Sequence, residues 1–419
     1  MTDAVEVTVS IDGEDLDAGV LRPSRRKGRD VGATWSYNAG YLADPRAYPI
    51  DPRLPLREGS QHTRPGQLMF GALTDCSPDR WGRILMQRAQ RSASQDGHAT
   101  RQLAELDYLL GARDDLRQGA LRFRGHRDGP FLADGDHGVP ALTDLAELLD
   151  LADRADDDDL VAEELARLVR AGSSLGGARP KAHVRTVSGE AAIAKFPSAQ
   201  RDTWDVMAWE AVTLTLARGA GIRVPEFQLI QIGGRSVLVL NRFDRQGQLT
   251  GAGASVRVGY VSAMTMLEAT DGDVGDFLDL VEVAEQHSPA ATEDIHELWR
   301  RAVFSALVSN TDNHLRNHGY LRTATGWRLA PAFDLNPNPD ASELAVGVDG
   351  RFIGVVDTAM ACAELFRLDR EDAQETLDEI VESVAGWERV ASANRLDAQA
   401  VRRMRPAFHH AEAARAADL

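Results

Sequence analysis

Apolar and polar residues alternate along the first forty residues, as at Val5, Val7 and Val9, with Gly and Asp turns between the stretches. A period of two is typical of strands with one buried face. We therefore expect a small antiparallel sheet at the N-terminus. A Pro-rich connection over residues 42–65 leads to helical spacing at residues 79–91 and 100–112, and a returning strand is predicted at residues 120–124.

Helix and strand patterns alternate in the middle of the chain. Two amphipathic helices are predicted within residues 142–170, and a hairpin at residues 181–196 joins KAHVRT to AAIAKF through the turn VSGE. The helix pattern of residues 203–221 ends at a glycine, and residues 226–234 and 236–243 predict a second strand pair. Helical spacing dominates afterwards. The fold class is therefore α+β, with a sheet-rich first half and a helical second half.

The composition, 43% hydrophobic and 26% charged residues, is that of an ordinary globular protein. No apolar stretch approaches the roughly 20 residues needed to cross a bilayer. The first residues are acidic where a signal peptide is basic, so we expect a cytoplasmic protein that makes no membrane contact. Cys76 and Cys362 are the only cysteines, which fits a reducing compartment and disfavours structural zinc.

The formal net charge is −17, which opposes nonspecific DNA binding by the chain alone, because such binding depends on Lys and Arg neutralising phosphates. A basic group at residues 22–27 could touch nucleic acid if a basic partner brought it there. The alternative is a solvated loop. DNA contact is therefore expected only through a partner.

Lysine is rare in this chain, since only Lys27, Lys181 and Lys195 occur among 47 basic residues. Positions that keep lysine are candidates for chemistry that arginine cannot do, because lysine offers a compact point charge on a slim stem. Lys195 lies in the middle of the predicted strand AAIAKF, where a charge is hard to justify by packing alone.

Residues 172–181, GSSLGGARPK, form a loop of small residues between a predicted helix and the hairpin. Glycines there let backbone N–H groups approach phosphate oxygens, and Lys181 adds a cation. The alternative is an ordinary turn, because glycine-rich connections are common.

Residues 310–317, NTDNHLRN, follow an apolar helix directly. The five-residue step from Asp312 to Asn317 is the spacing of a kinase catalytic loop, in which the Asp accepts the proton of the substrate hydroxyl and the Asn holds magnesium. The alternative is a loop whose Asp and Asn side chains only cap backbone N–H groups.

An apolar run, LAPAFDL, ends in the single carboxylate of Asp334 soon after the strand pair GYLRT and WRLA. A kinase places a metal-binding Asp at this point, although the motif here lacks the usual glycine, which leaves switching by an activation loop open. A carboxylate that caps a turn is the alternative.

These segments follow one another in the order found in kinases. After the glycine loop comes Lys195, which would grip the nucleotide phosphates, and Glu210 in the next helix could hold Lys195 by an ion pair. The alternative for Glu210 is a solvated helix face. We divide the chain on this basis into three parts, residues 1–125, residues 126–243 with the glycine loop, and residues 244–419 with the catalytic loop.

The sequence resembles the HipA-like toxin kinases over nearly the whole chain. Besides SSLGGARPKA, NTDNHLRNHGYL and LAPAFDL, the resemblance includes AGYLADPRAYPIDPRLPL, CSPDRWGRIL and the hinge-like LVLNRFDR. It implies a serine/threonine protein kinase with a protein-kinase-like two-lobed fold, in which a sheet-rich N-terminal lobe with an accessory subdomain precedes an all-helical C-terminal lobe. The accessory subdomain would be residues 1–125, the kinase N-lobe residues 126–243 and the C-lobe residues 244–419.

The resemblance also implies roles for particular residues. Asp312 would be the catalytic base, with ATP and Mg²⁺ as cofactors and with Asn317 and Asp334 as the metal ligands. The residues implied in ATP binding are Gly176, Gly177, Ala178, Arg179, Pro180, Lys181, Lys195, Asn241, Arg242, Phe243, His314, Asn317, Phe333 and Asp334. Family members autophosphorylate a serine of the glycine loop, which Ser174 matches, with Ser173 as the alternative.

The resemblance implies a small helix-turn-helix antitoxin (HipB-like) as partner and a protein substrate, which in studied members is an aminoacyl-tRNA synthetase. Two alternatives stay open. One is a catalytically silent, kinase-shaped corepressor bound to a DNA-binding antitoxin, and the other is a small-molecule kinase. ATP hydrolysis or autophosphorylation would separate the enzyme from the corepressor.

Overall fold

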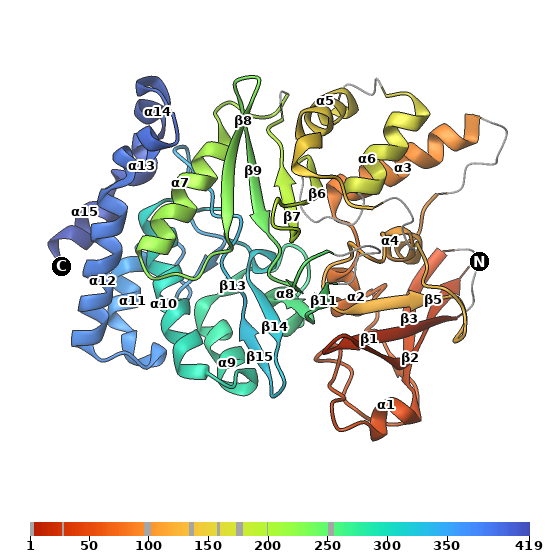
Figure 1. The fold of residues 1–419 in the computed structure, drawn as a ribbon. Coiled ribbons are helices and arrows are strands. Elements are labelled where there is room, and N and C mark those ends of the chain that lie inside the picture. The colour runs from red at the N-terminus through yellow and green to blue at the C-terminus, as the bar shows by residue number, and fades with distance from the viewer. Residues whose placement is uncertain are drawn as a thin grey trace. The chain divides into compact units, whose positions relative to one another are not determined.

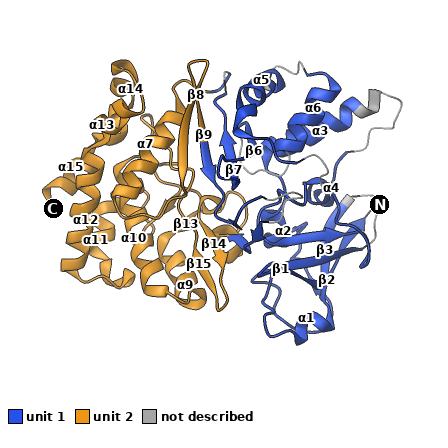
Figure 2. Ribbon diagram, in the orientation of Figure 1, with its two compact units in different colours: residues 1–201, 239–261 blue, residues 202–238, 262–419 orange. Residues whose placement is uncertain are grey.

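The structure is a computed structural model, which describes residues 4–26, 29–95, 102–133, 138–156, 160–172, 179–198, 200–249 and 255–419 (Figure 1). The chain forms two compact units (Figure 2). The first unit comprises residues 1–201 and 239–261, and the second comprises residues 202–238 and 262–419. Within the described residues, no helix has both the length and the apolar character that crossing a membrane requires.

The first unit begins with a five-stranded antiparallel sheet in the order β4-β3-β2-β1-β5. Its strands are β1 (Val5–Ile11), β2 (Glu14–Arg26), β3 (Arg29–Tyr37), β4 (Gln61–His62) and β5 (Leu121–Arg124). Val5, Val7 and Val9 are buried, as their alternation predicts. The predicted N-terminal sheet and its returning strand are thus confirmed.

Six helices of the first unit are described, together with a 3₁₀ turn at Leu142–Asp144. They are α1 (Ala39–Ala43), α2 (Gly71–Asp75), α3 (Arg80–Gln95), α4 (Glu105–Gly111), α5 (Leu145–Asp156) and α6 (Ala162–Gly172). Helices α3, α5 and α6 share an apolar core that contains Trp81, Leu151 and Leu168. The two helices predicted within residues 142–170 are therefore present.

A buried ionic cluster surrounds Asp114, whose side chain is fully buried. Its carboxylate accepts hydrogen bonds from Arg117 at 3.2 Å, from Arg122 at 2.6 Å and from Arg257 at 2.9 Å. Arg257 also donates to the carbonyl of Asp114 at 2.7 Å. Buried charges require such partners, so the cluster joins residues 114–122 to Arg257, which lies far away in the sequence.

The predicted hairpin and second strand pair form one four-stranded sheet in the order β6-β7-β9-β8. Its strands are β6 (Lys181–Arg185), β7 (Ala191–Lys195), β8 (Phe227–Ile232) and β9 (Arg235–Asn241). The boundary between the two units falls within β9. Two further short strands of the first unit, β10 (Arg245–Gln246) and β11 (Val256–Arg257), pair antiparallel.

The second unit is mainly helical, as the spacing predicts. Its helices are α7 (Val206–Gly219), α8 (Ala263–Met266), α9 (Phe277–His287), α10 (Ala291–Leu307), α11 (Val355–Ala361), α12 (Arg370–Ala385), α13 (Trp387–Ala393), α14 (Ala398–Phe408) and α15 (Ala411–Asp418). Helix α10 packs against α9, α11, α12 and α15 and buries Trp299 and Phe304 completely. A helix that is buried on most sides is the centre of its unit.

Short strands accompany these helices, so the C-terminal part is not purely helical. They are β12 (Tyr260–Ser262), β13 (Gly275–Asp276), β14 (Gly319–Arg322), β15 (Trp327–Leu329) and β16 (Val346–Gly347). Strands β14 and β15 are the predicted pair GYLRT and WRLA, and β13 pairs parallel with β16.

The two units differ from the three predicted parts. The sequence pattern places a boundary near residue 125 because an expected sheet ends there, but the N-terminal sheet and the β6–β7 hairpin belong to the same unit. Helix α7 follows that hairpin in sequence and packs with α12 and α13. Such long-range packing leaves no periodic signal in the sequence, so the extent of a compact unit cannot be predicted from periodicity alone.

Candidate active site

The two lysines of the hairpin face each other. Lys181 is the first residue of β6, Lys195 is the last residue of β7, and the strand register pairs them directly. Residues directly opposite on antiparallel strands project from the same face of the sheet. Both side chains are buried, with exposed fractions of 8% and 7%. The hairpin thus concentrates two positive charges at one end of one face.

Backbone packing fixes the entry to the hairpin. The indole N–H of Trp81 donates to the carbonyl of Lys181 at 3.1 Å, and the N–H of Phe196 donates to the carbonyl of Pro180 at 2.9 Å. Gly172 ends α6, and a Cβ atom there would lie 2.7 Å from the carbonyl oxygen of Lys181. Only glycine allows this close approach, so the sequence must carry it where the loop begins.

The central part of the predicted phosphate loop, residues 173–178, lies outside the described residues. The predictions for Ser173, Ser174, Gly176, Gly177 and Ala178 therefore stay predictions. The described end of the loop runs through Arg179 and Pro180 into β6.

The predicted hinge, Asn241 to Phe243, begins at the last residue of β9. The amide of Asn241 donates to the Glu190 carboxylate at 3.0 Å. The guanidinium of Arg242 is buried, bonds both carboxylate oxygens of Asp244 at 2.8 and 2.6 Å and donates to the Leu116 carbonyl at 2.6 Å. Since these partners occupy the side chain of Arg242, any contact of this residue with ATP falls to its backbone.

Glu210 lies on α7 in the second unit and is only 1% exposed. This burial rules out the solvated helix face that the sequence left open. A buried carboxylate requires a charged or hydrogen-bonding partner, as an ion pair would supply. The ion pair with Lys195 stays a prediction.

The predicted catalytic loop begins where α10 ends. Ser309 adopts a left-handed conformation at φ 48°, and its carbonyl accepts the N–H of Asn338 at 3.0 Å. Asn310 is buried, and its side-chain oxygen accepts the N–H of Asn336 at 3.1 Å. Left-handed backbone is unfavourable for residues other than glycine, so these contacts hold a strained turn in place.

Asp312 and Asn317 are brought together, as their spacing predicts. The Asn317 amide donates to the backbone carbonyl of Asp312 at 2.8 Å. The side chain of Asp312 is 80% exposed, and its Oδ1 lies 3.9 Å from Nε2 of His314. The carboxylate of Asp312 is therefore accessible to a substrate hydroxyl.

Asn313 anchors the loop to residues 345–346. It is 2% exposed, and its side-chain oxygen accepts the N–H groups of Ala345 and Val346 at 2.9 and 3.1 Å. Its amide nitrogen donates to the Val346 carbonyl at 3.3 Å. The capping alternative thus holds for Asn310 and Asn313, whose side chains do bind backbone N–H groups.

Asp334 also adopts a left-handed conformation, at φ 56°. It follows Phe333 in the segment after β15, and the N–H of Ala332 in that segment donates to the Arg223 carbonyl at 2.7 Å. Strained backbone in a non-glycine residue is often found at functional sites.

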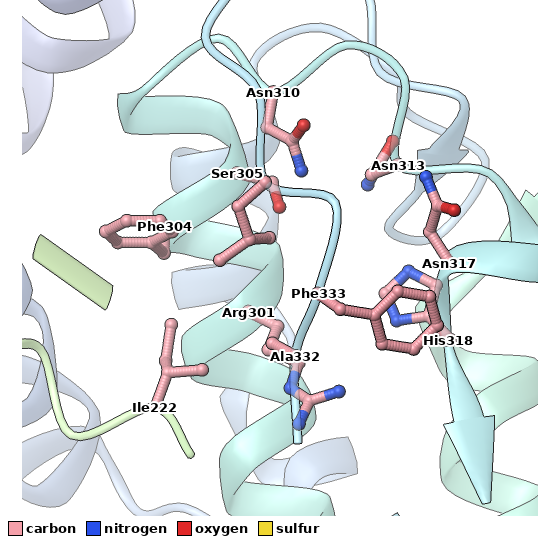
Figure 3. Close-up of a pocket in the computed structure, with 11 residues that line it drawn as sticks. Ile222, Arg301, Phe304, Ser305, Asn310, Asn313, Asn317, His318, Ala332 and Phe333 are labelled. Carbon is pink, nitrogen blue, oxygen red and sulfur yellow. The ribbon is translucent and has the colours of Figure 1, made fainter. Parts of the chain in front are cut away.

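The catalytic loop and the Asp334 segment border one pocket in the second unit. Its lining residues are Ile222, Arg301, Phe304, Ser305, Asn310, Asn313, Asn317, His318, Ala332, Phe333 and Leu335. Figure 3 shows the amide groups of Asn310, Asn313 and Asn317 along one rim of it. The structure therefore unites Asn317 and Phe333, which are 16 residues apart in sequence.

Sequence reasoning missed several residues of this pocket, above all Asn310, Asn313, Arg301 and His318. Burial lowers the pKa of His318 to about 3, so its imidazole is neutral at physiological pH. The two asparagines stand in the loop motif, but polarity alone does not distinguish an anchor from a reacting group. Arg301 lies within a helix pattern and gives no local signal.

The residues present fit a bound magnesium ion. Among the described residues, no group of three or more His, Cys, Asp or Glu side chains gathers as a metal cage. Magnesium in nucleotide sites is usually held by one or two protein oxygen ligands together with phosphates and water. Asn317 and Asp334 are a donor set of that kind.

Comparison with known proteins identifies the family to which the chain belongs. Residues 173–387, just over half of the chain, match the HipA-like C-terminal domain. "Putative kinase Y4mE" of Sinorhizobium fredii is 26% identical over 329 residues, which are 73% of this chain and 72% of that protein. "Putative kinase Y4dM" of the same organism is 31% identical over 159 residues, which are 34% of this chain and 36% of that protein.

Among solved structures, the fold matches HipA in the complex of the Shewanella oneidensis MR-1 toxin–antitoxin system, HipA, HipB and operator DNA. The TM-score is 0.65 at 17% identity, and the match covers 98% of this chain and 97% of that one. The chain thus has the kinase-like α+β fold of HipA. With the family match over the segment that carries the glycine loop, the catalytic loop and Asp334, this chain belongs to the HipA-like family.

Proposed function

We propose that this chain is an ATP-dependent serine/threonine protein kinase and the toxin of a toxin–antitoxin pair. The family match, the HipA fold and the kinase names of its relatives support this proposal. The reaction would transfer the γ-phosphoryl group of ATP to a protein hydroxyl. An aminoacyl-tRNA synthetase is the substrate class that the family resemblance suggests.

The observation that carries the proposal is the pairing of Lys181 with Lys195. Like charges placed directly opposite on a sheet repel each other, and burial strengthens the repulsion. Two lysines on one face of the sheet are a suitable pair of cationic donors for an anion of high charge. A nucleoside triphosphate is such an anion, and two of the three lysines in the chain lie at this position.

The catalytic loop supplies the other half of the chemistry. Asp312 would accept the proton of the substrate hydroxyl, because its carboxylate is exposed while its backbone is held by Asn317. Asn317 and Asp334 would hold Mg²⁺, which neutralises charge on the phosphates when it is bound. Glu210 would pair with Lys195.

We further propose that Ser174, or alternatively Ser173, is autophosphorylated and that this modification inactivates the enzyme. A phosphate adds close to two negative charges, which would oppose those of ATP at the same loop. Intact-mass measurement after incubation with Mg-ATP should show one added phosphate in the wild type and none in Ser174→Ala. An adduct that persists in Ser174→Ala but disappears in Ser173→Ala would move the site by one residue.

The partner would be a small DNA-binding antitoxin. The solved HipA structure contains HipB and operator DNA. A net charge of −17 is unsuitable for direct DNA binding by the chain itself and suits a basic partner.

Calorimetric titration and a transfer assay test the proposed activity. We expect magnesium-dependent ATP binding by the wild type, and Asp312→Asn should retain binding while losing phosphoryl transfer. Asp357→Asn on α11 is the matched control and should behave as the wild type, because Asp357 forms only an exposed ion pair with Arg415 of α15. Transfer at the wild-type rate by Asp312→Asn would contradict the assigned base, and binding without transfer by the wild type would favour the corepressor.

A further inference from the structure

Helix α10 leads directly into the catalytic loop and carries three buried charged residues on one side. Asp294, Glu297 and Arg301 are spaced three and four residues apart, which places them in one row along the helix. Their exposed fractions are 0%, 7% and 3%. Charged residues are seldom buried so deeply unless they are paired, so their partners indicate what the row does.

The row binds two arginines from other segments of the second unit. Arg223, in the connection between α7 and β8, donates to the carboxylates of Glu297 and Asp294, the latter at 2.9 Å. Arg328, in β15, donates to Asp294 at 2.9 Å. Arg301 donates to Glu297 from both Nε and Nη2, the former at 3.0 Å. Each carboxylate thus meets two guanidinium groups.

The same network holds the backbone that leads to Asp334. Asp294 accepts the N–H of Leu329 at 3.1 Å, and Arg301 donates to the carbonyl of Ala330 at 2.6 Å. The N–H of Ala332 donates to the carbonyl of Arg223 at 2.7 Å. Three successive points of residues 329–332 are therefore fixed from α10 and its partner Arg223.

A buried ionic network of this kind is weak evidence for stability alone, because well-packed apolar residues often stabilise a core equally well. Its geometric effect is more specific. Helix α10 leads into the catalytic loop at its C-terminal end, and its side chains form hydrogen bonds with the backbone that precedes Asp334. Figure 3 shows Arg301 beside Ala332 on the wall of the pocket that Phe333 and Asn317 also line.

We propose that Arg301, oriented by Glu297, is a positioning residue that sets the place of Phe333 and Asp334 relative to the catalytic loop. This inference rests on the proposed function for its catalytic consequence. The purely positional part does not, because it concerns hydrogen bonds within the protein itself.

Hydrogen–deuterium exchange of the nucleotide-free protein tests the positional part. Arg301→Met removes the bond to Ala330 and the bridge to Glu297, so amide exchange across residues 329–335 should rise by about tenfold or more, as expected for local opening. Arg301→Lys keeps a charge and should lie between Arg301→Met and the wild type.

The matched control is Arg300→Met on the same helix. Arg300 donates to the Ala220 carbonyl at 3.0 Å and pairs with Glu379, so its partners lie outside residues 329–335. Exchange in that segment should stay at the wild-type level in this variant. A thermal scan of each variant separates local opening from global loss of structure, and Glu297→Gln serves as a milder substitution if Arg301→Met unfolds.

Magnesium titration of phosphoryl transfer tests the consequence. Loss of a residue that orients a metal ligand typically costs about tenfold to a hundredfold in metal affinity or activity, so Arg301→Met should need correspondingly more Mg²⁺ while its ATP titration at saturating Mg²⁺ changes less. Unchanged exchange and an unchanged Mg²⁺ requirement in folded Arg301→Met would overturn the inference. If the wild type fails to bind Mg-ATP, the proposed function fails, and the exchange result still decides the positional role.

Discussion

Asn313 is the position where a single substitution should reveal how the catalytic loop is supported. Its side chain makes three hydrogen bonds, two from backbone N–H groups and one to a backbone carbonyl, all within residues 345–346. Asn313→Ala removes all three hydrogen bonds at once and leaves the backbone groups of Ala345 and Val346 without this partner. Val346 is fully buried, so water cannot readily replace them.

The expected cost follows from these contacts. Each hydrogen bond contributes about 1 kcal/mol net, and groups left unsatisfied in the interior cost more, so Asn313→Ala should lower the free energy of unfolding by about 3 kcal/mol. For a unit of this size, each kcal/mol shifts the unfolding midpoint by roughly 2–4 °C, which gives a decrease of about 6–12 °C. Circular dichroism during heating measures it.

The same substitution should weaken Mg-ATP binding, because the loop that carries Asp312 and Asn317 loses its anchor. Asn394→Ala is a suitable control, since the side-chain amide of Asn394, at the end of α13, donates to the backbone carbonyl of Val390 at 2.9 Å. It should cost about 1 kcal/mol and leave Mg-ATP affinity unchanged. A midpoint shift under about 2 °C in Asn313→Ala, with wild-type affinity, would refute the reasoning.

Two further predictions concern the first unit. Burial would raise the pKa of Asp114, but Arg257, Arg122 and the rest of its arginine cluster outweigh that effect and hold the pKa below its usual value. The ionised carboxylate therefore stabilises the folded state above about pH 4, and this stabilisation is lost as the pH falls further. Asp114→Asn should therefore lose about 3–5 kcal/mol at pH 7 and show weaker acid dependence in thermal scans, and equal acid sensitivity would contradict this. Lys195→Met and Lys195→Arg should each weaken Mg-ATP binding by calorimetry, by roughly ten- to a hundredfold, since a charge-assisted bond contributes about 1.5–3 kcal/mol; full affinity in Lys195→Arg would show that only charge matters.

The strands and helices of the second half could be predicted because their burial is periodic. The β6–β7 hairpin is the clearest case, since a four-residue turn joins two apolar strands. The sequence also singles out Lys181 and Lys195 separately, through their rarity. That they pair directly depends on the register, which the predicted turn misses by one residue. Counting outward from the turn VSGE places Ala182 opposite Lys195, whereas the structure pairs Lys181 with Lys195.

The hydrogen bonds between α10 and the segment that precedes Asp334 could not be predicted in this way. Arg223 lies 74 residues before Glu297, and Arg301 lies 29 residues before Ala330. Periodicity reports only which face of an element is buried, whereas these bonds depend on where unconnected segments meet. The burial of Arg301 would point to such a role, but burial is known only from the structure, so the sequence gives no local signal.

The polar residues of the predicted catalytic loop divide into buried and exposed groups. Asn310 and Asn313 turn inward and bind backbone groups, whereas Asp312 and His314 are exposed. The capping interpretation therefore holds for the two inward asparagines, whereas the catalytic role of Asp312 stays a prediction. Because inward anchors fix the backbone on both sides of Asp312, its carboxylate can remain accessible without the loop losing its conformation, which is the condition that a general base requires.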